Sequence, residues 1–75
     1  MTKEIGFKFV PTFPSNIFYF QVRGYDKERD LVLTTVYTKD GQCFDDRMEG
    51  IYYDAAFDIG EYKEMPEKAE KYEYR

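Results

Sequence analysis

Hydrophobic and polar residues alternate along much of the chain, and this period of two is typical of half-buried β-strands. The stretch 5–10 places Ile5, Phe7 and Phe9 on one side. Pro11 and Pro14 then interrupt the pattern, because proline cannot donate a backbone hydrogen bond to a strand ladder. The stretch 17–25, which reads IFYFQVRGY, resumes the alternation and predicts a second strand. One face of that strand is purely apolar and is expected to be core; it holds Phe18, Phe20 and Val22.

The other face of the stretch 17–25 is amphipathic and carries Tyr19, Arg23 and Tyr25. Residues 26–30, DKERD, predict a hairpin loop, and residues 31–38, LVLTTVYT, predict its returning strand because β-branched residues suit a pleated sheet. Pairing Tyr25 with Leu31 brings Tyr19 opposite Tyr37 across the hairpin. Four residues are therefore the binding candidates: Tyr19, Arg23, Tyr25 and Tyr37. They form either an exposed binding face or a second core layer, covered by the C-terminal segment or by the far wall of a small barrel.

The second half of the chain continues with a turn signal. Asp40-Gly41 favours a two-residue type I′ hairpin turn and predicts a return strand from Gln42 to about Asp45. The following DDRMEG is expected to break or bend the chain, with Gly50 as the flexible point. Residues 51–62 alternate well enough to predict a strand. A helix is the rival, since apolar residues also recur there at a spacing of four.

Together these elements predict a mainly β fold. We expect a small antiparallel meander or partly open barrel of about five strands, with a short C-terminal helix. The chain, residues 1–75, reads as a single small domain, and residues 66–75 are either the short helix or a frayed tail. Pro66 suits the first position of a helix, but a helix this short and polar is marginal in isolation.

Composition adds that the core must be aromatic. The 75-residue chain has seven Phe and eight Tyr, and a domain of this size buries only about 60% of its surface on folding. Cys43 is the only cysteine and there is no histidine, so an internal disulfide and a Cys/His zinc site are excluded. Cys43 is expected to be a small buried side chain rather than a nucleophile. A homo-oligomer is a further possibility for so small and ring-rich a domain.

The residue types argue against catalysis. Without histidine the commonest general base is missing. None of the five glycines falls in the GxxxxGK or GxGxxG spacing that binds phosphate groups. The acidic residues near Asp40 do not fit an EF-hand, because that alignment places Arg47 where a bidentate Glu is required. The chain is therefore expected not to be an enzyme, and no cofactor and no metal ion is expected.

Charge points to the class of partner. Residues 1–39 have six basic and four acidic side chains, a net charge of +2; residues 40–75 have five and eleven, a net charge of −6. A net charge of −4 favours a protein partner, either a second copy or a basic protein surface, and disfavours nucleic acid and membranes. The expectation is a non-catalytic protein–protein interaction module, such as an acidic inhibitor or adaptor. The alternative is a single-stranded nucleic-acid-binding domain that uses the tyrosine and arginine face. A lone cysteine and the lack of an apolar leader predict a cytoplasmic location.

Overall fold

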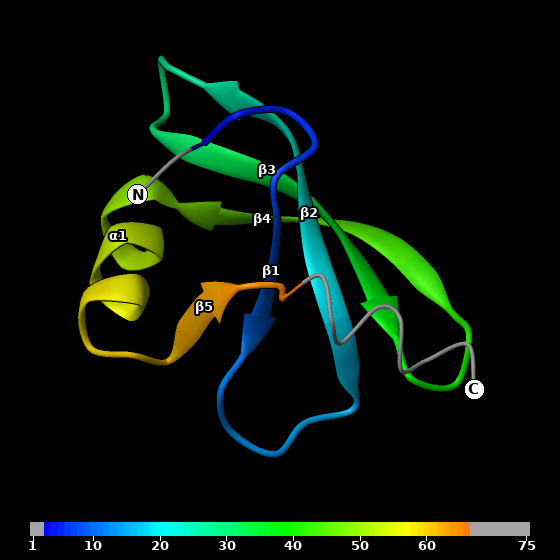
Figure 1. Ribbon diagram of the computed structural model, residues 1–75. Coiled ribbons are helices and arrows are strands. Elements are labelled where there is room, and N and C mark those ends of the chain that lie inside the picture. Colours follow the sequence, from blue (N-terminus) through cyan, green and yellow to red (C-terminus); the bar gives the residue numbers. More distant parts are fainter. Residues whose placement is uncertain (1–2, 67–75) are drawn as a thin grey trace.

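Five antiparallel strands form one open sheet, with a short helix packed against it, in the computed structural model, which describes residues 3–66 (Figure 1). The order of strands across the sheet is β4-β3-β2-β1-β5. The elements are β1 (Lys8–Pro11), β2 (Ile17–Asp26), β3 (Leu31–Thr38), β4 (Cys43–Glu49), α1 (Gly50–Asp58) and β5 (Tyr62–Glu64). The prediction of a mainly β, five-stranded antiparallel fold is confirmed. The helix expected near the C-terminus falls almost entirely on residues 67–75, outside the described range.

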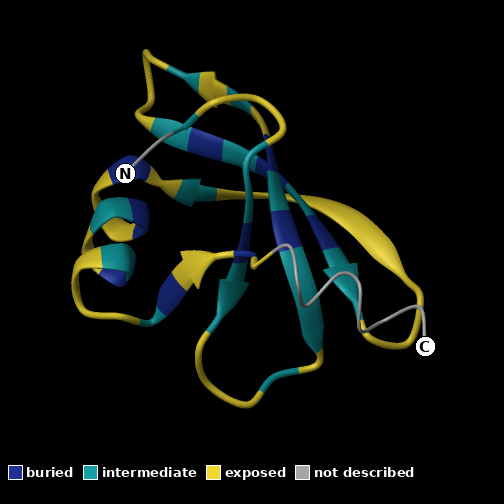
Figure 2. Ribbon diagram, in the orientation of Figure 1, coloured by how far each residue is buried: buried dark blue, intermediate teal, exposed yellow. Residues whose placement is uncertain are grey.

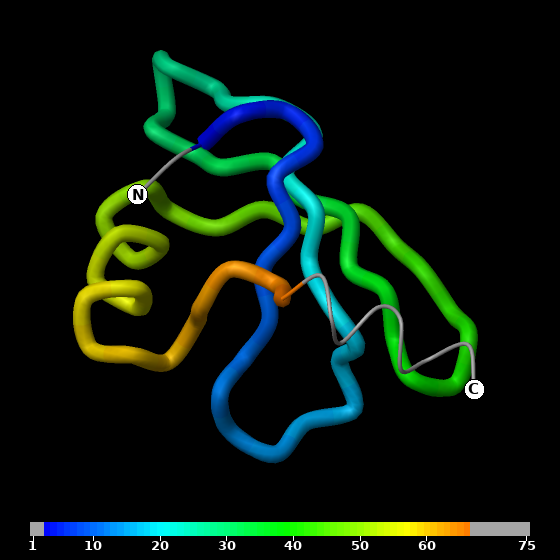
Figure 3. The backbone as a smooth tube through the Cα atoms, viewed as in Figure 1, coloured from blue at the N-terminus to red at the C-terminus, as the bar shows by residue number. Residues whose placement is uncertain are grey.

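Strands β2, β3 and β4 form the predicted meander, which the tube in Figure 3 follows through its two tight connections. The turn between β3 and β4 differs from the two-residue turn that Asp-Gly predicted. Gly41 alone has a positive φ, 90°, and its N–H donates to the Thr38 carbonyl over 3.2 Å. This is a three-residue loop in which glycine takes the left-handed position. Strand β4 also continues to Glu49, beyond the predicted break after Asp45.

The core lies between the sheet and α1. Its centre is Phe9, which is fully buried and stacks on Phe20 with ring centroids 4.8 Å apart. Tyr53 of α1 meets Phe9 edge-on at 5.3 Å. The dark segments of Figure 2 mark the buried residues of the sheet and of the helix, whereas β4 is almost wholly exposed. The remaining buried apolar residues are Val22, Val32, Val36, Ala56, Tyr62 and Met65.

The predicted strand over residues 51–62 is wrong: residues 50–58 form α1. Tyr53, Ala56 and Phe57 lie on one helical face at spacings of three and four, and this face packs on the sheet. Ile51 and Ile59, which the strand interpretation aligned on one apolar face, are 71% and 70% exposed. Gly60, at φ 83°, follows the helix in the left-handed conformation that commonly ends one.

Two side chains expected in the core lie elsewhere. Phe18 is only half-buried because the pairing of β2 with β3 shifts register between Ile17 and Tyr19, which makes Phe18 an extra residue in its strand. Cys43 is exposed, since it begins β4 at the outer edge of the sheet. The inward position at this end of the sheet belongs to Ile17, which packs against the core.

Candidate functional site

The sheet face opposite α1 is the candidate site, and we call it the outer face. Within residues 3–66 no helix or strand packs over it, because α1 is the one helix and it contacts the core side. Strand alternation decides which side chains the face presents, since successive residues point to opposite sides of a sheet. By the register of the pairs, it presents Lys8, Val10, Tyr19, Gln21, Asp26, Leu31, Leu33, Thr35, Tyr37, Cys43, Asp45, Arg47, Glu49 and Lys63. Arg23 joins them from an irregularity of β2, through its contact with Asp45.

Tyr19 and Tyr37 form the centre of the outer face. They are directly opposite each other in the ladder, as predicted, and their rings stack with centroids 4.5 Å apart and planes at 21°. The Lys8 ammonium lies 5.3 Å from the centroid of the Tyr19 ring, and Phe18 meets that ring edge-on at 4.9 Å. The ring of Tyr19 therefore already has three neighbours. A nucleobase that stacks on an aromatic side chain needs an open face of the ring, and these neighbours leave little of the Tyr19 ring face open.

Arg23 lies in the second irregularity of β2, between Val22 and Gly24. Its Nε–H donates to the Thr34 carbonyl over 3.1 Å, and the Nε atom is 3.6 Å from Asp45 Oδ1. Thr35 donates its hydroxyl to the same carboxylate oxygen over 3.4 Å. Because the extra residue of the bulge is outside the ladder, the guanidinium reaches across β3 toward β4. Arg23 is thus held in place while 40% of its side chain remains exposed.

Tyr25 does not belong to this face, and its predicted place there is wrong. The irregularity at Arg23 changes the register, so Tyr25 pairs with Val32, a fully buried core residue, instead of Leu31. An extra residue in a strand with period two turns every later side chain to the opposite face. The Tyr25 hydroxyl donates to Asp30, and this hydrogen bond, with lesser effects of burial and nearby carboxylates, raises the pKa of Tyr25. Three of the four predicted residues therefore come together: Tyr19, Arg23 and Tyr37.

The charges of the sheet are segregated by face, which sequence reasoning did not detect. Strand alternation places four cations on the outer face, against three carboxylates; the residues are Lys8, Arg23, Arg47, Lys63, Asp26, Asp45 and Glu49. The outer face thus has a net charge of +1, although the whole chain has −4. Acidic residues gather on the helix side instead, where Asp54, Asp58, Asp46 and Glu64 lie. Strand alternation alone would have placed Lys8 on the face of its strand that Phe7 and Phe9 do not occupy. Placing Lys63 and Asp45 on the same face required the strand pairing, which the sequence does not show.

Two chemical features bear on metal binding and on membranes. Among residues 3–66, no three of the side chains that commonly bind metals (His, Cys, Asp or Glu) lie close enough together to hold an ion. Over the same range, α1 is too short and too polar to cross a membrane. What the outer face can do chemically is bind: it offers hydroxyls, an amide, a fixed guanidinium and lysines around a pair of rings.

No family model, no curated protein and no solved structure matches this chain.

Proposed function

We propose that this protein is a non-catalytic interaction module that binds a protein partner on its outer face. The observation that supports the proposal is that the sheet has one face under α1 and one face that no described element covers. That second face carries a stacked tyrosine pair and, further along β2, a positioned arginine. Tyrosine and arginine are enriched among the residues that dominate binding energy in protein interfaces.

The geometry also favours a particular partner chemistry. Net charge alone predicts a basic partner, and such a partner would meet the acidic helix side. The outer face is locally cationic, so we propose that its partner is an acidic protein surface. Charge complementarity of this kind accelerates association and excludes like-charged competitors. The cytoplasm is the proposed compartment, since Cys43 is a single exposed thiol that a reducing environment keeps free.

Single-stranded nucleic acid is the second candidate occupant of the same face. The cations of the outer face favour it, because phosphate contacts by Lys and Arg supply most of the affinity for nucleic acid. The stacked arrangement of Tyr19 and Tyr37 disfavours it, because each ring covers one face of the other. We therefore rank it below a protein partner.

Photo-cross-linking in the cell of origin tests the proposal. A benzoylphenylalanine is placed at Tyr37, on the outer face, and in a matched protein at Tyr52, which is 49% exposed on α1. We expect a discrete protein adduct from position 37 and none from position 52. An adduct from position 52 alone would overturn the proposal. An adduct from position 37 that nuclease digests would replace it with the nucleic-acid candidate.

A further inference from the structure

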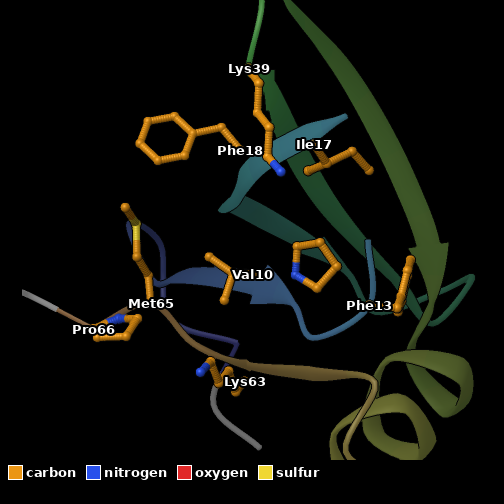
Figure 4. A pocket seen from close by; sticks show the side chains of 9 residues that line it. Val10, Phe13, Ile17, Phe18, Lys39, Lys63, Met65 and Pro66 are labelled. Atoms are coloured by element: carbon orange, nitrogen blue, oxygen red, sulfur yellow. The ribbon is translucent and has the colours of Figure 1, made fainter. Parts of the chain in front are cut away.

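A pocket opens at one end of the sheet, where β1, β2 and β5 approach the turn between β3 and β4 (Figure 4). Its volume is about 290 Å³. Apolar side chains form most of its walls, and two lysines contribute the rest. The lining includes Val10, Ile17, Phe18, Met65, Lys39 and Lys63.

Local sequence features build this pocket. The extra residue in β2 keeps the Phe18 ring out of the core, so the ring becomes a wall of the pocket. Lys39 is fixed at the mouth because its backbone N–H donates to the Asn16 carbonyl over 2.8 Å. Met65 closes the other side, with its N–H donating to the Lys8 carbonyl over 3.0 Å. The pocket therefore exists before any partner arrives.

Two positive charges border this apolar space. In Figure 4 the side chain of Lys39 extends toward the pocket between Ile17 and Phe18, and Lys63 lies at the opposite side. Neither ammonium group has an ion-pair partner among residues 3–66. Apolar walls attract a ring or an aliphatic chain, and unpaired ammonium groups at the mouth attract carboxylates.

The size of the pocket selects among ligands that combine these two chemistries. Pockets for drug-sized molecules span roughly 300–1,000 Å³ and enclose most of the ligand. This pocket lies at the lower limit, which suits one large side chain rather than a whole small molecule. Interfaces commonly use such a pocket for a single anchor residue at the centre of the contact.

We propose that the pocket receives one aromatic or large aliphatic side chain of an acidic partner segment, whose neighbouring carboxylates pair with Lys39 and Lys63. This inference rests on the proposed function and specifies the partner: an acidic segment with a hydrophobic anchor. Beyond the pocket, Lys8 and Arg23 continue the line of cations along the outer face, so acidic residues flanking the anchor also meet positive charge.

Fluorescence anisotropy with a defined probe tests the pocket. The probe is the fluorescein-labelled peptide Asp-Asp-Phe-Asp-Asp, titrated with the full chain at low ionic strength, where exposed ion pairs are least screened. We expect Lys39→Glu to weaken binding about five- to tenfold, because one exposed ion pair becomes a repulsion. The matched control is Lys27→Glu, the same charge change in the loop at the far end of the β2–β3 hairpin, and it should change affinity less than twofold. A peptide with Ser in place of Phe should bind at least about fivefold more weakly.

Two results would overturn the inference. Equal losses in Lys39→Glu and Lys27→Glu would mean that overall charge, not the pocket, attracts the probe. Loss of binding in Arg23→Ser combined with Tyr37→Ser, but not in Lys39→Glu, would remove the pocket and leave the proposed function intact.

Discussion

Replacing Phe9 by leucine tests whether one ring organises the core. Phe9 is fully buried and contacts five other rings, those of Phe7, Phe20, Tyr53, Phe57 and Tyr62. Aromatic pairs contribute about 0.5–1.5 kcal/mol each beyond area burial, and contacts around one residue are not additive. Leucine keeps most of the apolar volume, so we expect a loss of about 2 kcal/mol. A chain of 75 residues has a total stability of only about 4–11 kcal/mol.

Urea unfolding followed by circular dichroism measures this loss. With a slope of about 1 kcal/mol per molar urea for a small domain, the midpoint should fall by about 2 M. Phe44→Leu is the matched control, because Phe44 is 51% exposed, and its midpoint should move by less than about 0.5 M. Equal shifts for the two variants would refute the reasoning, since they would mean that the cluster around Phe9 adds nothing beyond the residue type.

Three further perturbations test separate features. The Thr34 hydroxyl is buried with no hydrogen-bond partner among the described residues, so Thr34→Val should raise the free energy of unfolding by about 1 kcal/mol. A lower free energy of unfolding for Thr34→Val, measured with urea, would contradict this. A Cβ on Gly50 would approach the Asp30 Cγ atom to 2.8 Å, so Gly50→Ala should destabilise the protein. In an Asp30→Gly background that contact is gone, and the same substitution should stabilise the protein by up to ~1 kcal/mol, because alanine favours a helix over glycine. Equal changes in the free energy of unfolding in both backgrounds, measured by urea unfolding, would exclude the clash. Burial raises the pKa of Tyr53 to about 12, so the folded state favours the neutral phenol. The resulting contribution to the free energy of unfolding is complete below pH 10 and disappears as the pH rises to 12. Tyr53→Phe should therefore flatten the decline in stability that urea unfolding measures between pH 10 and pH 12.

Strand alternation predicted most of the fold because the sheet has one buried face. Phe9, Phe20 and Val22 lie in the core as period two requires, and Tyr19 pairs with Tyr37 as predicted. The helix α1 was missed because its apolar residues fit both periods, and only tertiary packing decides that Tyr53 points inward while Ile51 does not. Gly60 marks the position after the end of that helix.

The candidate site was predicted in part, and the error has one cause. A period-two argument assumes a strand without extra residues, whereas β2 contains two irregularities. The one at Arg23 turns Tyr25 to the helix side, and the one at Phe18 places its ring beside the pocket. Gly24, a glycine inside a strand, was a signal for a bulge. Lys63 of β5 could not be placed on the outer face, because strand order across a sheet is not encoded in local spacing.

The most direct test of the account is an amide chemical-shift map of the ¹⁵N-labelled protein during titration with the Asp-Asp-Phe-Asp-Asp peptide. The account predicts that shifts concentrate on the outer face and the adjoining pocket, at Tyr19, Arg23, Tyr37, Lys39 and Lys63, while residues 51–58 of α1 stay unchanged. Shifts confined to α1, or no shifts at peptide concentrations that saturate the anisotropy signal, would contradict the claim that the outer face of the sheet is the binding surface.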